Sequence, residues 1–265
     1  MTDSVHTPDE VRPGWLPWVM FSSIAANIFA IVSINYWIYY ARAAFIATHP
    51  DYVALQPPTI SRAISDPAIG EPFAFWVTLS AIALIPGMLG ISLAYGRIAR
   101  GAPVLAARVL MLTAVGLALF QAASSVGIYL LSSYRFPNHN YMHMMGSYIF
   151  FIAQAMVMVM FLLLGVVALR CRVTMQRVEH SANVQLRWVR LRAGVACLSI
   201  AMVLIYMVLF LIKTMDFGAA NEFVYATYVL AEPVVISSFL LCLAMFQTDL
   251  WAIARGRDQS RDKDI

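Results

Sequence analysis

Long apolar runs separated by short polar segments dominate the chain. Six such runs cover residues 15–41, 72–96, 104–134, 141–169, 193–212 and 223–251. About 20 residues of α-helix cross a hydrocarbon core of roughly 30 Å, so each run is long enough to span a membrane. The strict alternation of β-barrel strands is missing. The pattern predicts an all-α polytopic membrane protein, with a single bundle of six transmembrane helices over residues 15–251.

The distribution of charge predicts the orientation of this bundle. Only 12% of the 265 residues are charged, against about a quarter in soluble domains, and 61% are hydrophobic. Fourteen of the eighteen Lys and Arg residues fall in the tail 1–14, the connection 97–108, the connection 170–192 and the tail 252–265. By the positive-inside rule both termini are cytoplasmic. The net charge of +4 therefore orients the bundle, and we expect no nucleic-acid partner.

The connection 170–192 carries six arginines. Such a run fixes orientation, and its alternative role is contact with anionic lipid or a partner protein. The Ala- and Arg-rich style of the chain suggests a bacterial source. We therefore expect an integral protein of a bacterial inner membrane or a plasma membrane.

The longest external connection, residues 42–71, is expected to be structured. Pro57 and Pro58 stiffen its centre, and Ser65-Asp66-Pro67 is typical of a turn or a helix cap. Pro72 is expected at the start of the second span, where a missing N–H costs nothing. This loop either only covers the outer surface of the bundle or shapes a site at the outer leaflet.

Glu232 is the most unusual residue of the chain. It lies nine residues inside the last run, roughly 14 Å deep, where a charged carboxylate costs about 2.5 to 3.5 kcal/mol. Such a residue faces the bundle interior or a wet cavity. Pro233 removes a helical hydrogen bond next to it, which predicts a kinked, hydrated site. The alternative is a neutral Glu232 that holds two spans together.

Two histidines open the fourth run. His139 and His143 are four residues apart and share a face if the helix has already begun. One hypothesis is a metal site, but zinc requires a further ligand, and no motif spacing supplies one. The alternative is that both histidines hold the outer loops together.

Asn35 belongs to a group of polar residues that suggests a polar seam in the outer half of the bundle. We expect no cofactor, because no phosphate loop, GxSxG or CxxC motif is present.

Several short motifs, in order and spacing, resemble those of the Frag/DRAM/Sfk family of six-span membrane proteins, also described as the CWH-like N-terminal domain. They are Pro58-Thr59-Ile60-Ser61, Pro72-Phe73, His143-x-x-Gly146 with Phe150-Phe151, Ala231-Glu232, and Phe246-Gln247-Thr248-Asp249. The resemblance runs over nearly the whole chain. Pro233 stands where the family usually has Trp, and the external loop is longer than the family's.

The resemblance implies a function that concerns membrane lipid. Members of the family are linked with autophagy, GPI-anchor lipid remodelling, phosphoinositide signalling and lipid asymmetry. It implies importance for His143 and Glu232, followed by Ser61 and Asp249, and it implies no shared catalytic mechanism.

Three functional hypotheses follow. The first is a non-enzymatic protein that binds or modulates membrane lipid in an outer-leaflet cavity near Glu232 and His143, with His139, Ser61 and Asn35 as further ligand-binding candidates. Pro233, Pro58 and Asp249 are assigned structural roles, and no residue is assigned as catalytic. The second is a metal-dependent lipid acyl hydrolase or transferase. The third is proton-coupled transport through Glu232.

Overall fold

The computed structural model describes residues 13–182 and 184–255. The described chain is helical and has no strand. Six spans are long and apolar enough to cross a membrane, so this is an integral membrane protein. The long helices are α1 (Leu16–Thr48), α4 (Pro67–Ala99), α5 (Val104–Ser133), α6 (Asn140–Arg170), α8 (Leu186–Ile212) and α9 (Asn221–Met245), the last continued by α10 (Gln247–Arg255). The short ones are α2 (Pro50–Val53), α3 (Ile60–Ala63), α7 (Arg172–Ala182) and η1 (Gly218–Ala220).

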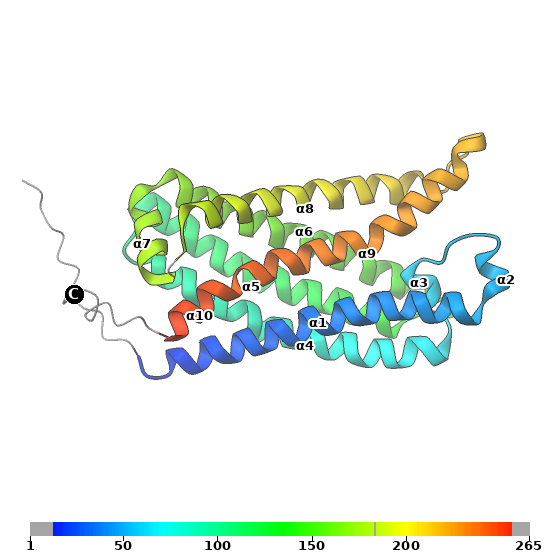
Figure 1. Cartoon of the computed structure of the whole chain (residues 1–265), viewed down its shortest axis with the longest axis horizontal. Helices are drawn as coiled ribbons and strands as arrows, with labels where there is room; N and C mark the ends of the chain where they lie inside the picture. Colours follow the sequence, from blue (N-terminus) through cyan, green and yellow to red (C-terminus); the bar gives the residue numbers. More distant parts are fainter. Residues whose placement is uncertain (1–12, 183, 256–265) are drawn as a thin grey trace, which may run out of the picture.

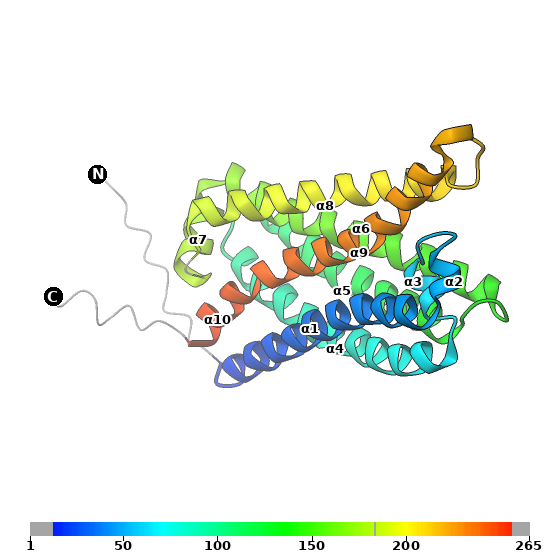
Figure 2. The ribbon, with the colours of Figure 1, turned by 45° about the vertical axis from the view of Figure 1, so that its right-hand side comes forward.

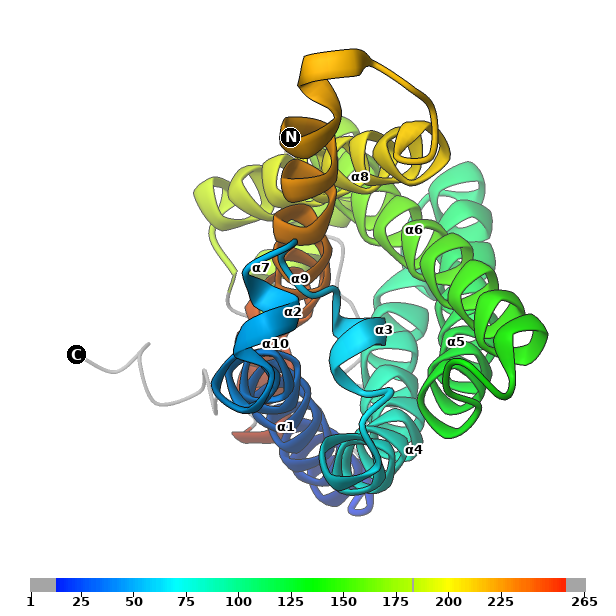
Figure 3. The same ribbon diagram turned by 90° about the vertical axis from the view of Figure 1, so that its right-hand side faces the viewer.

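The long helices form a ring. Around it α1 packs on α4, α4 on α5, α5 on α6, α6 on α8, and α8 on α9, while α9 and α10 return to α1. Seen end-on, α3 lies inside this ring (Figure 3). Helices α2, α3 and η1 lie at one end of the bundle, called the α3 end below, and α7 and α10 lie at the opposite, α7 end (Figure 1). Helix α9 runs obliquely from α8 at the α3 end toward α1 at the α7 end (Figure 2).

Helices α5 and α6 are in backbone contact. A Cβ atom on Gly146 would lie 2.9 Å from the carbonyl oxygen of Gly127, and a Cβ on Gly127 would lie 2.5 Å from the backbone nitrogen of Phe150. Real Cβ atoms do not approach backbone this closely, so both positions require glycine. Small residues allow the same close approach at other membrane helix interfaces.

The loop between the first two spans is shorter than the sequence predicts. Helix α1 continues to Thr48, and α4 begins at Pro67 rather than at Pro72, which lies inside the helix. The cause is the Asp66-Pro67 pair. Asp66 caps α4 by accepting the Ala68 N–H at 2.9 Å, and Pro67 occupies the first turn, where its fixed φ favours the helix. Thr59 caps α3 in the same way through the Arg62 N–H.

The described arginines that the sequence assigns to the cytoplasmic side lie at the α7 end, and one of them is buried; Arg12, Arg257, Arg261 and Lys263 lie outside the described residues. Helix α8 begins at Leu186, before the expected residue 193, and brings Arg192 into the bundle, where it is 5% exposed and ion-paired with Asp249. Asp249 is 1% exposed, and its carboxylate also accepts a hydrogen bond from the Tyr95 hydroxyl at 2.8 Å. Arg192 therefore joins α8 to α10 and does not belong to the exposed basic surface of residues 170–192. Arginines that remain exposed there are Arg170, Arg172, Arg187 and Arg190.

Candidate functional site

A cavity of about 330 Å³ lies at the α3 end of the bundle, between α3, α6, α8 and α9. Apolar and aromatic side chains form most of its wall, with a few charged and polar groups among them. Its lining residues are Thr59, Ser61, Arg62, Phe136, Pro137, His143, Met144, Ser147, Tyr148, Phe151, Tyr206, Met207, Phe210, Lys213, Tyr225, Tyr228 and Glu232. The volume and the mixed lining are typical of small-molecule sites.

Glu232 lines this cavity from α9. It lies eleven residues beyond Asn221, where α9 begins, which is about 16 Å along the helix axis. Its side chain is 6% exposed, and its Oε2 atom accepts the backbone N–H of Ile60 at 3.0 Å. This bond ties α9 to the first residue of α3. Helix α9 continues through Pro233, which is buried beside Glu232.

His143 and Ser61 also line this cavity and contact each other. The Nε2 atom of His143 lies 2.9 Å from the Ser61 hydroxyl, and its Nδ1 atom lies 3.1 Å from the carbonyl oxygen of Tyr134. His143 is 1% exposed. Ser61, His143 and Glu232, which the sequence analysis selected from distant segments, therefore line one cavity.

Two cations of this cavity were missed by sequence reasoning. Lys213 follows α8, and its Nζ atom lies 4.2 Å from the ring centroids of both Phe210 and Tyr228. Partial burial lowers the pKa of the Lys213 ammonium, and attraction to Glu232 acts in the opposite direction. Arg62 also lines the cavity and stacks over the Tyr52 ring at 4.7 Å. The sequence signal for Lys213 is a cation at the very end of a span, which by itself indicates only topology.

Three candidate residues lie outside the cavity. His139 is exposed just before α6, edge-on to the Tyr134 ring. Asn35 lies on α1, where its side-chain oxygen accepts the Ser237 hydroxyl at 2.8 Å. Asp249 belongs to the ion pair at the α7 end. Pro58, a predicted structural residue, is buried just before α3.

No metal site is assembled from the predicted ligands. Within residues 13–182 and 184–255, no three His, Cys, Asp or Glu side chains gather in a way that would hold a metal ion. The hypothesis of a site at His139 and His143 consequently has no third ligand in the described structure.

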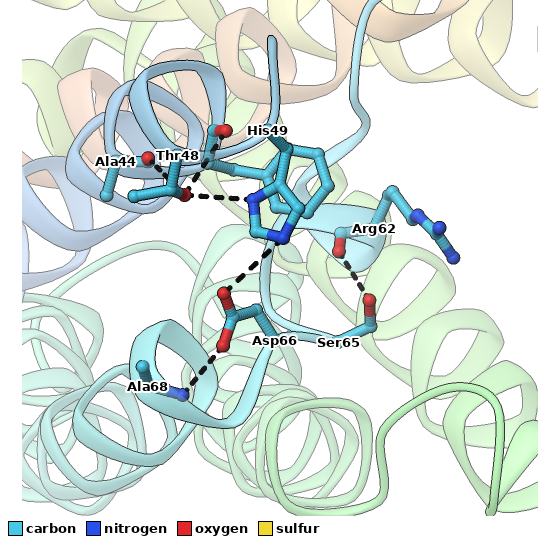
Figure 4. Close-up of polar contacts among 8 residues, drawn as sticks. Ala44, Thr48, His49, Arg62, Ser65, Asp66 and Ala68 are labelled. Carbon is cyan, nitrogen blue, oxygen red and sulfur yellow. Dashed lines mark hydrogen bonds and ion pairs between the residues drawn. The ribbon is translucent and has the colours of Figure 1, made fainter. Parts of the chain in front are cut away.

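The loop that carries α3 is fastened beside the cavity (Figure 4). His49 lies between Thr48 and Asp66, with its Nδ1 atom 2.9 Å from the Thr48 hydroxyl and its Nε2 atom 3.7 Å from the Asp66 carboxylate. Ser65 donates a hydrogen bond to the Arg62 carbonyl at 2.7 Å. These contacts join the end of α1 to the start of α4 and hold the loop across the α3 end.

No family model, curated protein or solved structure matches the chain. The functional argument therefore depends on the chemistry of the cavity.

Proposed function

We propose that this integral membrane protein binds one end of a membrane lipid in the cavity beside Glu232 and His143. The observation that carries the proposal is the amphipathic lining. Phe151, Met207 and Phe210 give the wall apolar contact surface, and Glu232 and Lys213 add charged groups to the same wall. A ligand that satisfies both kinds of group has an apolar chain and a polar group, as a lipid does.

The size and position of the cavity favour partial insertion. A volume of about 330 Å³ is too small for a whole phospholipid, so a headgroup or the end of an acyl chain enters while the rest stays in the bilayer. Residues of the membrane-spanning helices α6, α8 and α9 line the cavity, so it lies next to the bilayer from which a lipid would enter.

Charge indicates the leaflet from which the lipid comes. The exposed arginines Arg170, Arg172, Arg187 and Arg190 lie at the α7 end, which is the cytoplasmic end by the positive-inside rule. The cavity then faces the outer leaflet of a bacterial inner membrane or a plasma membrane. The resemblance to the Frag/DRAM/Sfk family agrees with a lipid ligand.

Native mass spectrometry of the full chain, released from gentle detergent, tests this proposal. The expected spectrum contains a retained lipid that Glu232→Ala loses. Met207→Trp, which fills the cavity with a bulky ring and removes no charged group, is expected to lose the same lipid. Glu222→Ala is the matched control, because Glu222 is exposed at the start of α9 and does not line the cavity. A lipid-free wild type, or equal retention by all variants, contradicts the proposal.

A further inference from the structure

The hydrogen bonds of His143 determine the direction of its contact with Ser61. A backbone carbonyl only accepts hydrogen bonds, so the Nδ1 atom that lies 3.1 Å from the Tyr134 oxygen carries the proton. In the neutral imidazole Nε2 is then the acceptor, and the Ser61 hydroxyl 2.9 Å away is the donor. This is the relation between a serine nucleophile and its general base, with a backbone carbonyl orienting the imidazole.

Both side chains are held in place. The His143 ring packs against the Phe136 ring, with 4.6 Å between centroids. Ser61 lies in α3, whose first residue, Ile60, is bonded to Glu232 at 3.0 Å and whose Arg62 N–H is capped by Thr59. Neither partner requires a large movement to react, which is the condition for efficient positioning.

The surroundings suit attack on an ester. Ser61, His143 and Lys213 all line the cavity, whereas the Arg62 side chain is exposed and its guanidinium lies over the Tyr52 ring. A cation inside a cavity of low polarity stabilises the negative oxygen that develops when a hydroxyl adds to a carbonyl. The same cavity thus holds a nucleophile, a base and one cation, Lys213, suited to oxyanion stabilisation.

We propose that Ser61 and His143 form a nucleophile and base pair that accepts the acyl group of a lipid ester bound in the cavity. This inference rests on the proposed lipid binding, and it departs from the non-enzymatic role expected from the sequence. Ser61 and His143 are then catalytic residues that require no metal ligand set.

The proposed reaction has two steps, the formation of an acyl-serine and its cleavage. The Ser61 oxygen adds to the ester carbonyl carbon while its proton passes to Nε2 of His143. The bond between the carbonyl carbon and the alcohol oxygen then breaks, the departing alcohol takes that proton, and an acyl-serine remains. In the second step water or another lipid hydroxyl adds to the acyl carbon, and Nε2 of His143 takes its proton. The bond between the acyl carbon and the Ser61 oxygen then breaks, and His143 returns the proton to the Ser61 oxygen.

Labelling of the purified full chain with a fluorophosphonate tests the pair, because this probe phosphonylates activated serines without needing a lipid. Intact mass is expected to show one adduct, mapped by peptide analysis to Ser61. Ser61→Ala removes the adduct, and His143→Gln, which keeps a polar side chain but no basic nitrogen, slows its formation about 100-fold or more. The control Ser65→Ala labels like the wild type, because the Ser65 hydroxyl bonds to the Arg62 carbonyl outside the cavity.

The outcomes separate this inference from lipid binding. If wild type and His143→Gln unfold at the same temperature and label at the same rate, or if no adduct forms on Ser61, the catalytic pair is refuted. Retained lipid without a Ser61 adduct refutes the pair and leaves lipid binding intact. A Ser61 adduct that depends on His143, in a protein without retained lipid, supports the pair and refutes lipid binding as proposed.

Discussion

Replacement of Glu232 by leucine is expected to release α3 from α9. The Ile60 N–H donates to the Glu232 carboxylate at 3.0 Å, and Ile60 is itself buried. Leucine fills a similar volume but accepts no hydrogen bond, so the Ile60 amide is left in the interior without an acceptor. Glutamine keeps a side-chain oxygen at the same distance from the backbone and retains the bond.

The size of the effect follows from the unpaired donor. A buried N–H without an acceptor costs about 1 to 3 kcal/mol. Removal of a carboxylate from the interior also removes a desolvation cost. The Glu232 carboxylate, however, lies near the Arg42 and Lys213 cations, which lose its attraction. We therefore expect the unpaired N–H to dominate and α3 to open more easily by about 1 to 3 kcal/mol, which is about 5- to 150-fold in an opening equilibrium.

Hydrogen exchange measured by mass spectrometry detects this opening directly. Amides of the peptide that covers α3 are expected to exchange about 5- to 150-fold faster in Glu232→Leu and within a few-fold of wild type in Glu232→Gln. Amides at the contact of α5 and α6 serve as the internal reference and are expected to stay unchanged. Equal exchange of the α3 peptide in wild type and Glu232→Leu would refute the anchoring role of Glu232.

Three further predictions concern stability and are measured by denaturant unfolding in detergent micelles. Asp249→Asn leaves Arg192 buried without its countercharge and is expected to cost about 3 to 5 kcal/mol of stability. Most of this loss is expected to be recovered when both residues are replaced by apolar ones. Equal stability of Asp249→Asn and wild type would contradict this. Gly146→Val forces α6 away from α5 and is expected to cost about 1 to 3 kcal/mol of stability. The control Gly194→Ala is expected to be neutral or stabilising, because a Cβ there meets nothing within 4 Å. Similar losses of stability in both variants would argue against the close contact of α5 and α6. Asp66→Ala removes the cap of α4 and is expected to cost about 0.5 to 2 kcal/mol, with Asp51→Ala, on the exposed surface of the same loop, as the neutral control.

The number of spans was predictable from the sequence, but their ends were less so. Six apolar runs are a strong signal, because a helix that crosses lipid must be apolar over its whole length. Helix α4 starts early because the cap at Asp66 and Pro67 acts locally, although the apolar run begins only at Pro72. Arg192 looked like one more cytoplasmic arginine, since its partner Asp249 lies on a different helix. Only the fold, in which the Arg192 side chain of α8 reaches Asp249 of α10, reveals that pair.

Three residues of the site were predictable from the sequence, but its geometry was not. Glu232 stood out because of its depth, His143 because of its spacing from His139 and a resemblance, and Ser61 through that resemblance alone. No local pattern indicates that three segments so far apart meet. His139 does not line the cavity, for a local reason. Two residues that are four apart share a face only if both belong to the same helix. Helix α6 begins at Asn140, after His139. Lys213 was overlooked because a cation at the end of a span is ordinarily explained by topology.

A density map of the full chain in lipid nanodiscs tests the central claim most directly. The account predicts an elongated density in the cavity, with its polar end within reach of Glu232, His143 or Lys213 and its apolar part toward the bilayer. That density is expected to vanish in Met207→Trp. A wild-type map in which side chains close the cavity, or in which the cavity is open but holds no lipid density, would contradict the account.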